Sequence, residues 1–443
     1  MGIFIGIGNT KPEFPYDYYY GVQINVNVAD TALTRVGRPE LHVTLPVQSL
    51  MRRCIVNDSG KVVTYLHPTD STKTDTGAAA DLTGKAGQVM VEIPKHYRKF
   101  EFDGTTITAL ISLHNLPGFH EVPKMYRSAY EATVDRTVSA TPKLASVVNK
   151  TANFRGGNNN SAWDDTYRSL LGVPATQISL TNFRKYARNR GNAGLNGCGW
   201  NCDLYAAQLA TYWLYVIEYA NLNCQAAYNA QPTDEGYKQG GLGNGVTTIN
   251  GTKWNTFNNY YPFIPCGITN SLGNRTGVVE FTMPTEYDST TTTKVNVPSY
   301  RGIENPFGHL WSWTDGCKCE IQSETEGGKS KFYVCEDPAK FQDSNYNDYE
   351  LRGELPRKEG YVKRMMIGEH GENMPTEVGG SSTTYFADYF YTNIPASGAS
   401  MRGVLFGGSA SYGADAGLSA APTNHAATNT NAYVGSRLCF IPE

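Results

Sequence analysis

Lys, Glu, Gln, Met and Trp are all missing from residues 407–435, although each occurs elsewhere in the chain. This window reads GGSASYGADAGLSAAPTNHAATNTNAYVG. The five missing residues are also those that the Asn codon AAC cannot encode when only its two adenines vary, and every residue present is reachable in that way. A loop in a β-rich protein has a similar composition, because Gly, Ser, Asn and Thr favour turns. The composition of residues 407–435 therefore fits either interpretation, and the residues on both sides of this window distinguish the two.

Charged residues and long apolar runs are also scarce. Only 18% of the 443 residues are charged and the net charge is -3, so the sequence predicts no basic face for nucleic acid. The apolar start, residues 1–8, is too short to span a membrane and lacks the basic stretch and cleavage site of a signal peptide. We therefore expect no membrane insertion and no export through an ordinary N-terminal signal.

The cysteines predict neither a disulfide framework nor a metal site. Their number is odd, and no secretion signal accompanies them. The pairs Cys198/Cys202 and Cys317/Cys319 have no second pair or nearby His at zinc-finger spacing. We expect buried free thiols, with no metal and no cofactor. The nine positions are Cys54, Cys198, Cys202, Cys224, Cys266, Cys317, Cys319, Cys335 and Cys439.

Hydrophobic periodicity predicts strands early in the chain, two helices in the middle, and irregular β structure after residue 236. Alternating apolar residues favour strands at 18–28 and 43–50. Helical spacing favours helices at 181–190 and 202–227, the second being the main core helix. This order indicates an α+β fold. The expected divisions are a lead-in at 1–16, a small β-rich region at 17–84 and one large domain at 85–443.

Three motifs in the second half of the chain resemble the formylglycine-generating branch of the C-type lectin fold. Gly308–Trp313 (GHLWSW) resembles its G-N-V-W-E-W motif, Arg402–Ser409 (RGVLFGGS) its R-V-L-R-G-G-S motif, and Gly435–Cys439 (GSRLC) its closing G-F-R strand. The chain departs from that pattern at Ser312, Ala410 and Ser436. The resemblance implies a C-type lectin-like domain at 85–443, following the β-rich N-terminal region.

Residues 403–437 resemble the variable region of proteins that are diversified by retroelements. Ala416–Leu418 and Ala426–Arg437 match closely, and Tyr433 stands where the template carries Asn. Upstream, Gly87–Pro94 and Phe183–Gly191 are similar to the scaffold of phage tail-tip relatives. The resemblance implies a receptor-binding protein at a phage tail-fibre tip, similar in role to the phage major tropism determinants. The open alternative is a diversified binding protein associated with the bacterial surface.

The same resemblance implies the site and its partners. Trp311 and Trp313 are expected in the core, Gly407 and Gly408 in a turn, and Arg437 beside a buried acceptor. The receptor, a protein or a glycan on the bacterial surface, is expected to contact one exposed patch. The implied setting is the virion, made in the bacterial cytoplasm, as a homotrimer joined to other tail-fibre proteins through the N-terminus. The patch residues are Ala410, Ser411, Tyr412, Asp415, Ser419, Ala420, Ala421, Thr423, His425 and Tyr433.

Other functions have weaker support in the sequence. Formylglycine-generating chemistry needs cysteines near the Gly-Gly-Ser segment, and none occurs between Phe406 and Leu438. His425 has no evident nucleophile beside it, so we predict no catalytic residues and no enzyme. The sugar-binding signatures of calcium-dependent lectins are missing, since the nearest match, Trp163–Asp165, lies in the wrong region. A purely structural tail subunit remains open.

Overall fold

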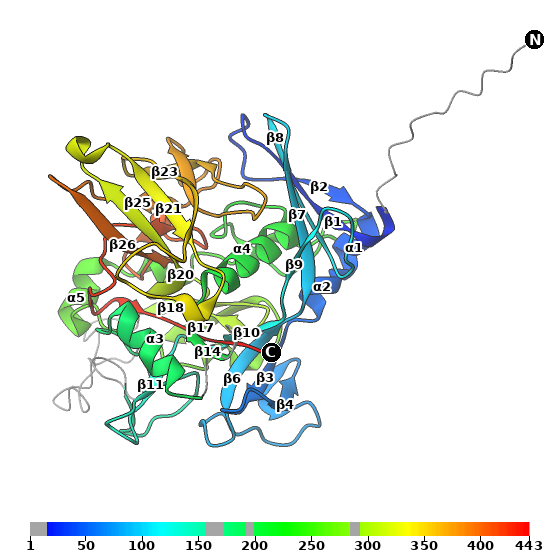
Figure 1. Cartoon of the computed structure of the whole chain (residues 1–443). Helices are drawn as coiled ribbons and strands as arrows, with labels where there is room; N and C mark the ends of the chain where they lie inside the picture. Colours follow the sequence, from blue (N-terminus) through cyan, green and yellow to red (C-terminus); the bar gives the residue numbers. More distant parts are fainter. Residues whose placement is uncertain (1–15, 156–171, 192–198, 284–292, 443) are drawn as a thin grey trace, which may run out of the picture.

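The structure is a computed structural model that describes residues 16–155, 172–191, 199–283 and 293–442 of the chain. Across these residues the fold is β-rich, with many short antiparallel strands and few helices (Figure 1). The mixed, strand-dominated character expected from the sequence is confirmed. Among the described helices, none is both long and apolar enough to cross a membrane.

The first sheet comes from residues 20–122 and has the strand order β2-β1-β8-β7-β9. Val22 and Ile24 of β1 are buried, as the alternation in residues 18–28 predicted. The sheet is antiparallel throughout. Its strands are β2 (Thr34–Gly37), β1 (Tyr20–Asn25), β8 (Thr106–Ser112), β7 (His96–Phe102) and β9 (His120–Val122).

The second sheet joins distant parts of the sequence in the order β14-β29-β10-β6-β3-β4-β5. Strand β29 lies inside it, between β14 and β10. Strands on both sides of residue 84 are hydrogen-bonded neighbours within it. The strands are β14 (Gly199–Cys202), β29 (Leu438–Ile441), β10 (Met125–Ser128), β6 (Gln88–Ile93), β3 (Arg52–Val56), β4 (Val62–His67) and β5 (Asp70–Thr74).

Helix α4 (Tyr205–Tyr219) is the main core helix, as predicted. Fourteen of its 15 residues are buried, so it is apolar on almost every side. It contacts β1 and the long strand β20 (Trp311–Gln322), and it lies between them in Figure 1. The helix ends before residue 227 because Ala220 adopts a left-handed backbone conformation with φ of 50°.

Residues 43–50 do not form the predicted strand. They belong to two short helices, α1 (Pro39–Thr44) and α2 (Pro46–Ser49). A proline in the first turn of each helix has a backbone angle already suited to helix. Leu45 between them is left-handed and buried, which breaks the two helices apart. The apolar spacing therefore reflects two separate helical turns.

Two further sheets lie in the second half of the chain. One has the order β22-β21-β20-β26, and β28 pairs with β20 in parallel. The other has the order β24-β23-β25-β27. Their remaining strands are β21 (Ser330–Val334), β22 (Glu350–Glu354), β23 (Gly360–Met365), β24 (Pro375–Val378), β25 (Tyr389–Tyr391), β26 (Ala399–Phe406), β27 (Ala421–Pro422) and β28 (Val434–Gly435).

The remaining elements are short strands and two helices around these sheets. Helix α3 (Leu180–Arg188) begins at Ser179, whose side chain accepts a hydrogen bond from the amide of Asn182. The others are α5 (Gly251–Asn258), β11 (Thr133–Asp135), β12 (Lys143–Ala145), β13 (Phe154–Arg155), β15 (Tyr228–Asn229), β16 (Gln239–Gly240), β17 (Gly277–Thr282), β18 (Lys294–Tyr300) and β19 (Ile303–Glu304).

The thiols and tryptophans behave as the sequence predicted. Cys198 lies outside the described residues, and the other eight cysteines are free and buried. Burial raises the pKa of the Cys202 and Cys439 thiols, which keeps them protonated at neutral pH. Trp311 and Trp313 are 2% and 1% exposed, so both belong to the core.

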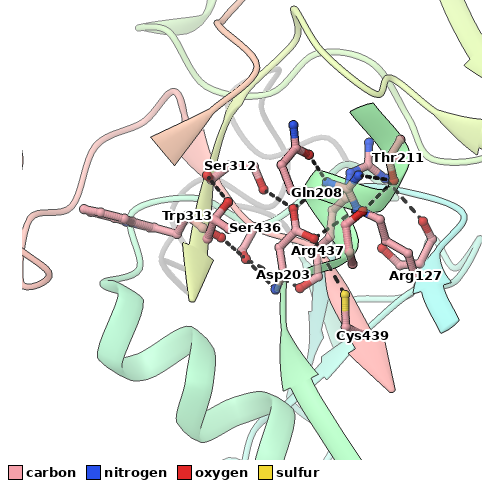
Figure 2. A network of polar contacts seen from close by, with 12 residues as sticks. Arg127, Asp203, Gln208, Thr211, Ser312, Trp313, Ser436, Arg437 and Cys439 are labelled. Atoms are coloured by element: carbon pink, nitrogen blue, oxygen red, sulfur yellow. Dashed lines mark hydrogen bonds and ion pairs between the residues drawn. The ribbon is translucent and has the colours of Figure 1, made fainter. Parts of the chain in front are cut away.

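A buried ion pair connects the second sheet, α4 and β20. Figure 2 shows Arg127 of β10 donating to both carboxylate oxygens of Asp203, at 3.0 and 2.7 Å. The same guanidinium donates to Gln208 and Thr211 of α4, at 2.6 and 2.9 Å. Ser312 of β20 donates to Asp203 at 3.1 Å. Since Arg127 and Asp203 are almost fully buried, each charge depends on the other for compensation.

Breaking this pair should destabilise the protein strongly. We expect Asp203→Asn to lower the free energy of unfolding by about 3–5 kcal/mol, because it leaves Arg127 buried without its counter-charge. Urea denaturation monitored by circular dichroism measures the change. The matched control is Glu280→Gln, which removes an exposed pair with Lys294 and should cost about 1 kcal/mol or less. Equal effects of the two substitutions would contradict the assigned role of Asp203.

Candidate functional site

Both ends of the 403–437 region are fixed to strand β20. On one side β26 pairs with β20, placing Phe406 opposite Ser312. On the other side β28 pairs with β20 in parallel, placing Val434 opposite Trp311. Between them, β27 pairs with β25, with Ala421 opposite Phe390. The intervening chain is therefore held at three points on strands.

Glycines allow the tight packing of the first loop, as expected for a turn after β26. Gly407 and Gly408 have φ angles of 106° and 83°, which other residues rarely adopt. A Cβ atom at Gly408 would lie 2.4 Å from the Cβ of Ala416, and one at Gly417 would lie 1.7 Å from a carboxylate oxygen of Asp388. These positions require glycine for steric reasons.

Arg437 is the last residue of the region, and it contacts buried acceptors, as the sequence predicted. Its guanidinium donates to the backbone carbonyls of Glu304 and Asn305, both at 2.5 Å, and to that of Ser128 at 3.3 Å. The side chain is buried. It thereby ties the end of the region to the scaffold beneath it.

Four half-buried tyrosines form a continuous aromatic surface beside the 403–437 region, which we call the tyrosine surface. Its members are Tyr361 of β23, Tyr389 and Tyr391 of β25, and Tyr412. Successive ring centroids are 5.0, 4.5 and 5.5 Å apart. The ring of Tyr412 also packs edge-on against Trp311 at 5.0 Å. Such contacts hold the rings in place while each keeps part of its area accessible.

Asp415 joins the tyrosine surface through two hydrogen bonds. It accepts from the hydroxyl of Tyr361 at 2.5 Å and from that of Tyr391 at 2.9 Å. Burial, followed by the hydrogen bond to Asp415 and its charge, raises the pKa of Tyr361 to about 12. Both hydroxyls therefore remain protonated donors at neutral pH. A residue of the 403–437 region thus orients two tyrosines that lie outside it.

Three other predicted site residues lie outside this surface and are at least partly exposed. Tyr433 is half-buried, and its ring centroid lies 6.2 Å from that of Tyr260, which follows α5. Ser411 is exposed beside Gly251, the first residue of α5. His425 is half-buried, and burial, followed by the charge of Arg402, lowers its pKa. Accessible members therefore come from both ends of the region.

The exposure predicted for the other five site residues is wrong. Ala410, Ser419, Ala420, Ala421 and Thr423 are all buried, none being more than 1% exposed. Four of them lie in or beside β27, which pairs with β25, whereas Ala410 is buried in a separate cluster with Trp254. Small side chains fit there because the space is already occupied by neighbouring core residues.

Individual contacts show how these five residues are used. Ala410 packs with the cluster that contains Trp254 and Phe263. The amide and hydroxyl of Ser419 donate to Asp388 at 2.7 and 2.6 Å. Thr423 donates its amide and hydroxyl to the carbonyl of Tyr391. These residues support the site from inside.

Sequence reasoning also missed two accessible tyrosines. Tyr361 lies in β23, where Val362 is buried and Tyr361 and Lys363 are half-buried. The residues of this strand do not reveal which loop will pack against it. Tyr260 follows the C-terminus of α5 with φ of 64°, and no local pattern marks it as a neighbour of Tyr433.

No family model matches the chain, and no curated protein matches it. Among solved structures it is similar to one named "Major Tropism Determinant I1 Variant", at 12% sequence identity and a TM-score of 0.21. That similarity covers 92% of this chain and 88% of the other. A TM-score of this size carries no argument about fold or function.

The buried carboxylate of Asp388 should make stability depend on pH. Burial raises its pKa to about 7, although hydrogen bonds from Ser419 act in the opposite direction. The folded state then binds this proton more tightly than the unfolded state, whose Asp pKa is about 4. The stabilisation is complete below about pH 4 and disappears as the pH rises to about 7.

We therefore expect the stability of the unmodified protein, relative to Asp388→Asn, to fall between pH 4 and 7. The fall should be roughly 4 kcal/mol at most, obtained from urea denaturation at several pH values. The control Asp30→Asn changes an exposed carboxylate. Parallel pH profiles for the unmodified protein and Asp388→Asn would mean that Asp388 has the same pKa in the folded and unfolded states and would contradict the prediction.

Proposed function

We propose that this chain is a receptor-binding protein of a phage tail fibre, which attaches to a bacterial surface receptor through the tyrosine surface and the accessible residues beside it. Tyr412 and Asp415 belong to residues 407–435, where every residue can be encoded by changing the adenines of an AAC codon. The main support is that Asp415 accepts hydrogen bonds from Tyr361 and Tyr391, and that Tyr412 packs against Tyr391. Positions that can vary thus lie within an aromatic framework whose backbone is fixed by strands.

The scaffold in this proposal is a C-type lectin-like domain of the formylglycine-generating branch. Its support is spatial, because the three motifs that resemble that branch become neighbours. Strand β20 begins at Trp311 within the first motif, β26 contains most of the second, and β28 ends at Gly435, the start of the third. Both β26 and β28 pair with β20. Three segments that are distant in sequence therefore share one sheet.

The tyrosine surface is well suited to binding. Tyrosine offers a large contact area with little loss of side-chain entropy, and interface energy often concentrates on a few aromatic residues. Here the rings are already held by one another and by Trp311, so ordering them on binding costs less. Their faces can pack against a protein or a glycan receptor, while the hydroxyls supply hydrogen bonds.

We propose binding rather than catalysis for this site. Oxidation of a cysteine substrate by a formylglycine-generating enzyme uses reactive thiols. The eight described cysteines are buried, and burial raises the pKa of thiols such as Cys317 and Cys319. Buried protonated thiols are poor nucleophiles. The chemistry at the 403–437 region is therefore that of contact and hydrogen bonding.

The proposed setting is the tip of a phage tail, with synthesis in the bacterial cytoplasm and function outside the cell after assembly. The N-terminal segment, residues 1–16, would join the chain to other tail-fibre proteins. A homotrimer would present three tyrosine surfaces to one cell. Multivalent presentation converts weak contacts at single sites into strong overall attachment.

Attachment should depend on the accessible residues of the proposed site. We expect simultaneous Tyr412→Asn and Asp415→Asn substitution to reduce binding to host cells by about 30-fold or more, since the loss of one aromatic anchor commonly costs about 2 kcal/mol or more. Pull-down of purified protein by host cells, quantified by immunoblotting, measures the loss. The change should leave the far-ultraviolet circular dichroism spectrum unaltered.

A matched control is Tyr18→Asn, which alters an exposed tyrosine next to the N-terminal sheet. This variant should bind like the unmodified protein. Full attachment by the double variant, or equal loss in Tyr18→Asn, would refute the assignment of the receptor site.

The trimer has its own test. Size-exclusion chromatography with light scattering should give a mass of about three chains, because tail-tip avidity requires several copies. A strictly monomeric protein at high concentration would count against the tail-fibre setting, while leaving the binding site itself open to the experiment above.

A further inference from the structure

A cavity of about 320 Å³ lies apart from the tyrosine surface, between the N-terminal sheet and the start of α4. Strands β7 and β9 contribute one side of it, and α4 with the middle of β20 and the end of β21 contributes the other. Its volume is at the lower end of the range for sites that bind small molecules. None of the residues implied by the sequence resemblance belongs to it.

The cavity has an exposed mouth and a buried floor. His120, Glu121 and Glu336 are exposed at the mouth. Tyr205 and Glu372 are only 3% exposed and lie deeper, where the tyrosine hydroxyl donates to the carboxylate at 2.5 Å. The apolar lining includes Val122, Leu209 and Phe341. A ligand that enters would therefore meet polar groups and an apolar wall together.

Arg98 is the unusual member of this lining. It lies in β7 directly opposite His120 of β9. Its Nη1 atom is buried without a hydrogen-bond partner. Burial lowers the pKa of Arg98, and the charge of Glu372, followed by that of Glu336, acts in the opposite direction. The buried arginines Arg127 and Arg184 each have an aspartate partner, at 2.7 and 2.5 Å. A buried donor without a partner is costly, so Arg98 has unused binding capacity.

The acidic residues around the cavity do not use this capacity, because each has another partner. Glu121 pairs with Lys95 at 2.8 Å and Asp315 with Arg184 at 2.5 Å. Glu336 pairs with Arg352 at 2.7 Å.

Glu372 is likewise engaged. It accepts from Tyr205, and the Nε atom of Arg352 lies 3.5 Å from it. Burial raises the pKa of Glu372, while the hydrogen bond from Tyr205 and the charges of Arg352 and Arg98 act in the opposite direction. Arg98 is therefore the lining cation that remains available for an anion.

We propose that this cavity binds a small molecule with one carboxylate and several hydroxyls, of the size of a sugar acid, whose carboxylate pairs with Arg98. A guanidinium matches a carboxylate through two parallel hydrogen bonds. Leu209 and Phe341 would pack against the apolar face of the ring. Glu372 and His370 would accept or donate hydrogen bonds to its hydroxyls. This site does not depend on the receptor-binding proposal.

The ligand could be free or could be the terminal residue of a surface glycan, since the mouth opens at exposed residues. Both share the same chemistry at Arg98. Isothermal titration calorimetry of the full chain distinguishes them with two sets of probes. The first contains free glucuronate, galacturonate and N-acetylneuraminate, and the second contains oligosaccharides that end in these residues. Glucose and galactose serve as ring-matched probes without a carboxylate.

At least one acidic sugar should bind, and its neutral counterpart should bind at least about 10-fold more weakly, because a hydrogen-bonded charge pair contributes more than a neutral contact. Arg98→Gln should weaken binding of that sugar by about 10- to 100-fold. Arg98→Lys keeps the positive charge but cannot form two parallel hydrogen bonds with a carboxylate, so it should have an intermediate effect. Arg364→Gln, which alters a paired surface arginine, should have none.

Thermal unfolding without ligand separates a binding role from a structural one. Because the buried Nη1 atom of Arg98 lacks a hydrogen-bond partner in the free protein, Arg98→Gln should leave the melting temperature unchanged or raise it. A fall of several degrees would assign Arg98 to stabilising the fold and overturn the proposal. Absence of binding by every acidic probe at millimolar concentration, or equal affinities of the unmodified and Arg98→Gln proteins, would also overturn it.

Discussion

The ion pair between Arg127 and Asp203 lies where several distant segments of the chain meet (Figure 2). Arg127 belongs to the seven-stranded sheet, Asp203 precedes α4, and Ser312 of β20 reaches the same carboxylate. Two charges without water are tolerated only when every donor and acceptor is matched, which restricts how these elements can be arranged. The position of β20, and of everything fixed to it, follows from this constraint.

Strand β20 in turn fixes the position of the candidate site. Since β26 and β28 both pair with it, the 403–437 region begins and ends on one rigid strand. Between these two strands, Gly408 packs closely against Ala416 and Gly417 packs closely against Asp388, because neither glycine carries a Cβ atom. A change of an accessible side chain such as Tyr412 therefore alters the surface with little effect on the backbone.

Local patterns in the sequence predicted the elements that depend on local forces. The alternation in β1 and the apolar residues of α4 are such cases. The burial of one side of a strand, or of a whole helix, follows from the spacing of apolar residues that are close in sequence. The apolar spacing in residues 43–50 resembles that of a strand. In the structure these residues belong to two short helices, each with a proline in its first turn and separated by the left-handed Leu45.

The site was only partly predictable for a different reason. Tyr412, Asp415 and Tyr433 were identified, but the burial of Ser419 and Ala421 depends on pairing between β25 and β27. Such pairing joins residues about thirty positions apart and leaves no signal in either segment alone. The contribution of Tyr361 depends on an even more distant contact with Asp415.

The place of β29 inside the seven-stranded sheet has a consequence for synthesis. Its partners β14 and β10 precede it by more than two hundred residues, so the sheet cannot be completed until the ribosome has passed the 403–437 region. Contacts of such long range form slowly. A chain interrupted within that region would leave two strand edges open to aggregation and proteolysis. Completion of the seven-stranded sheet therefore requires an intact reading frame through residues 403–437 and on to β29.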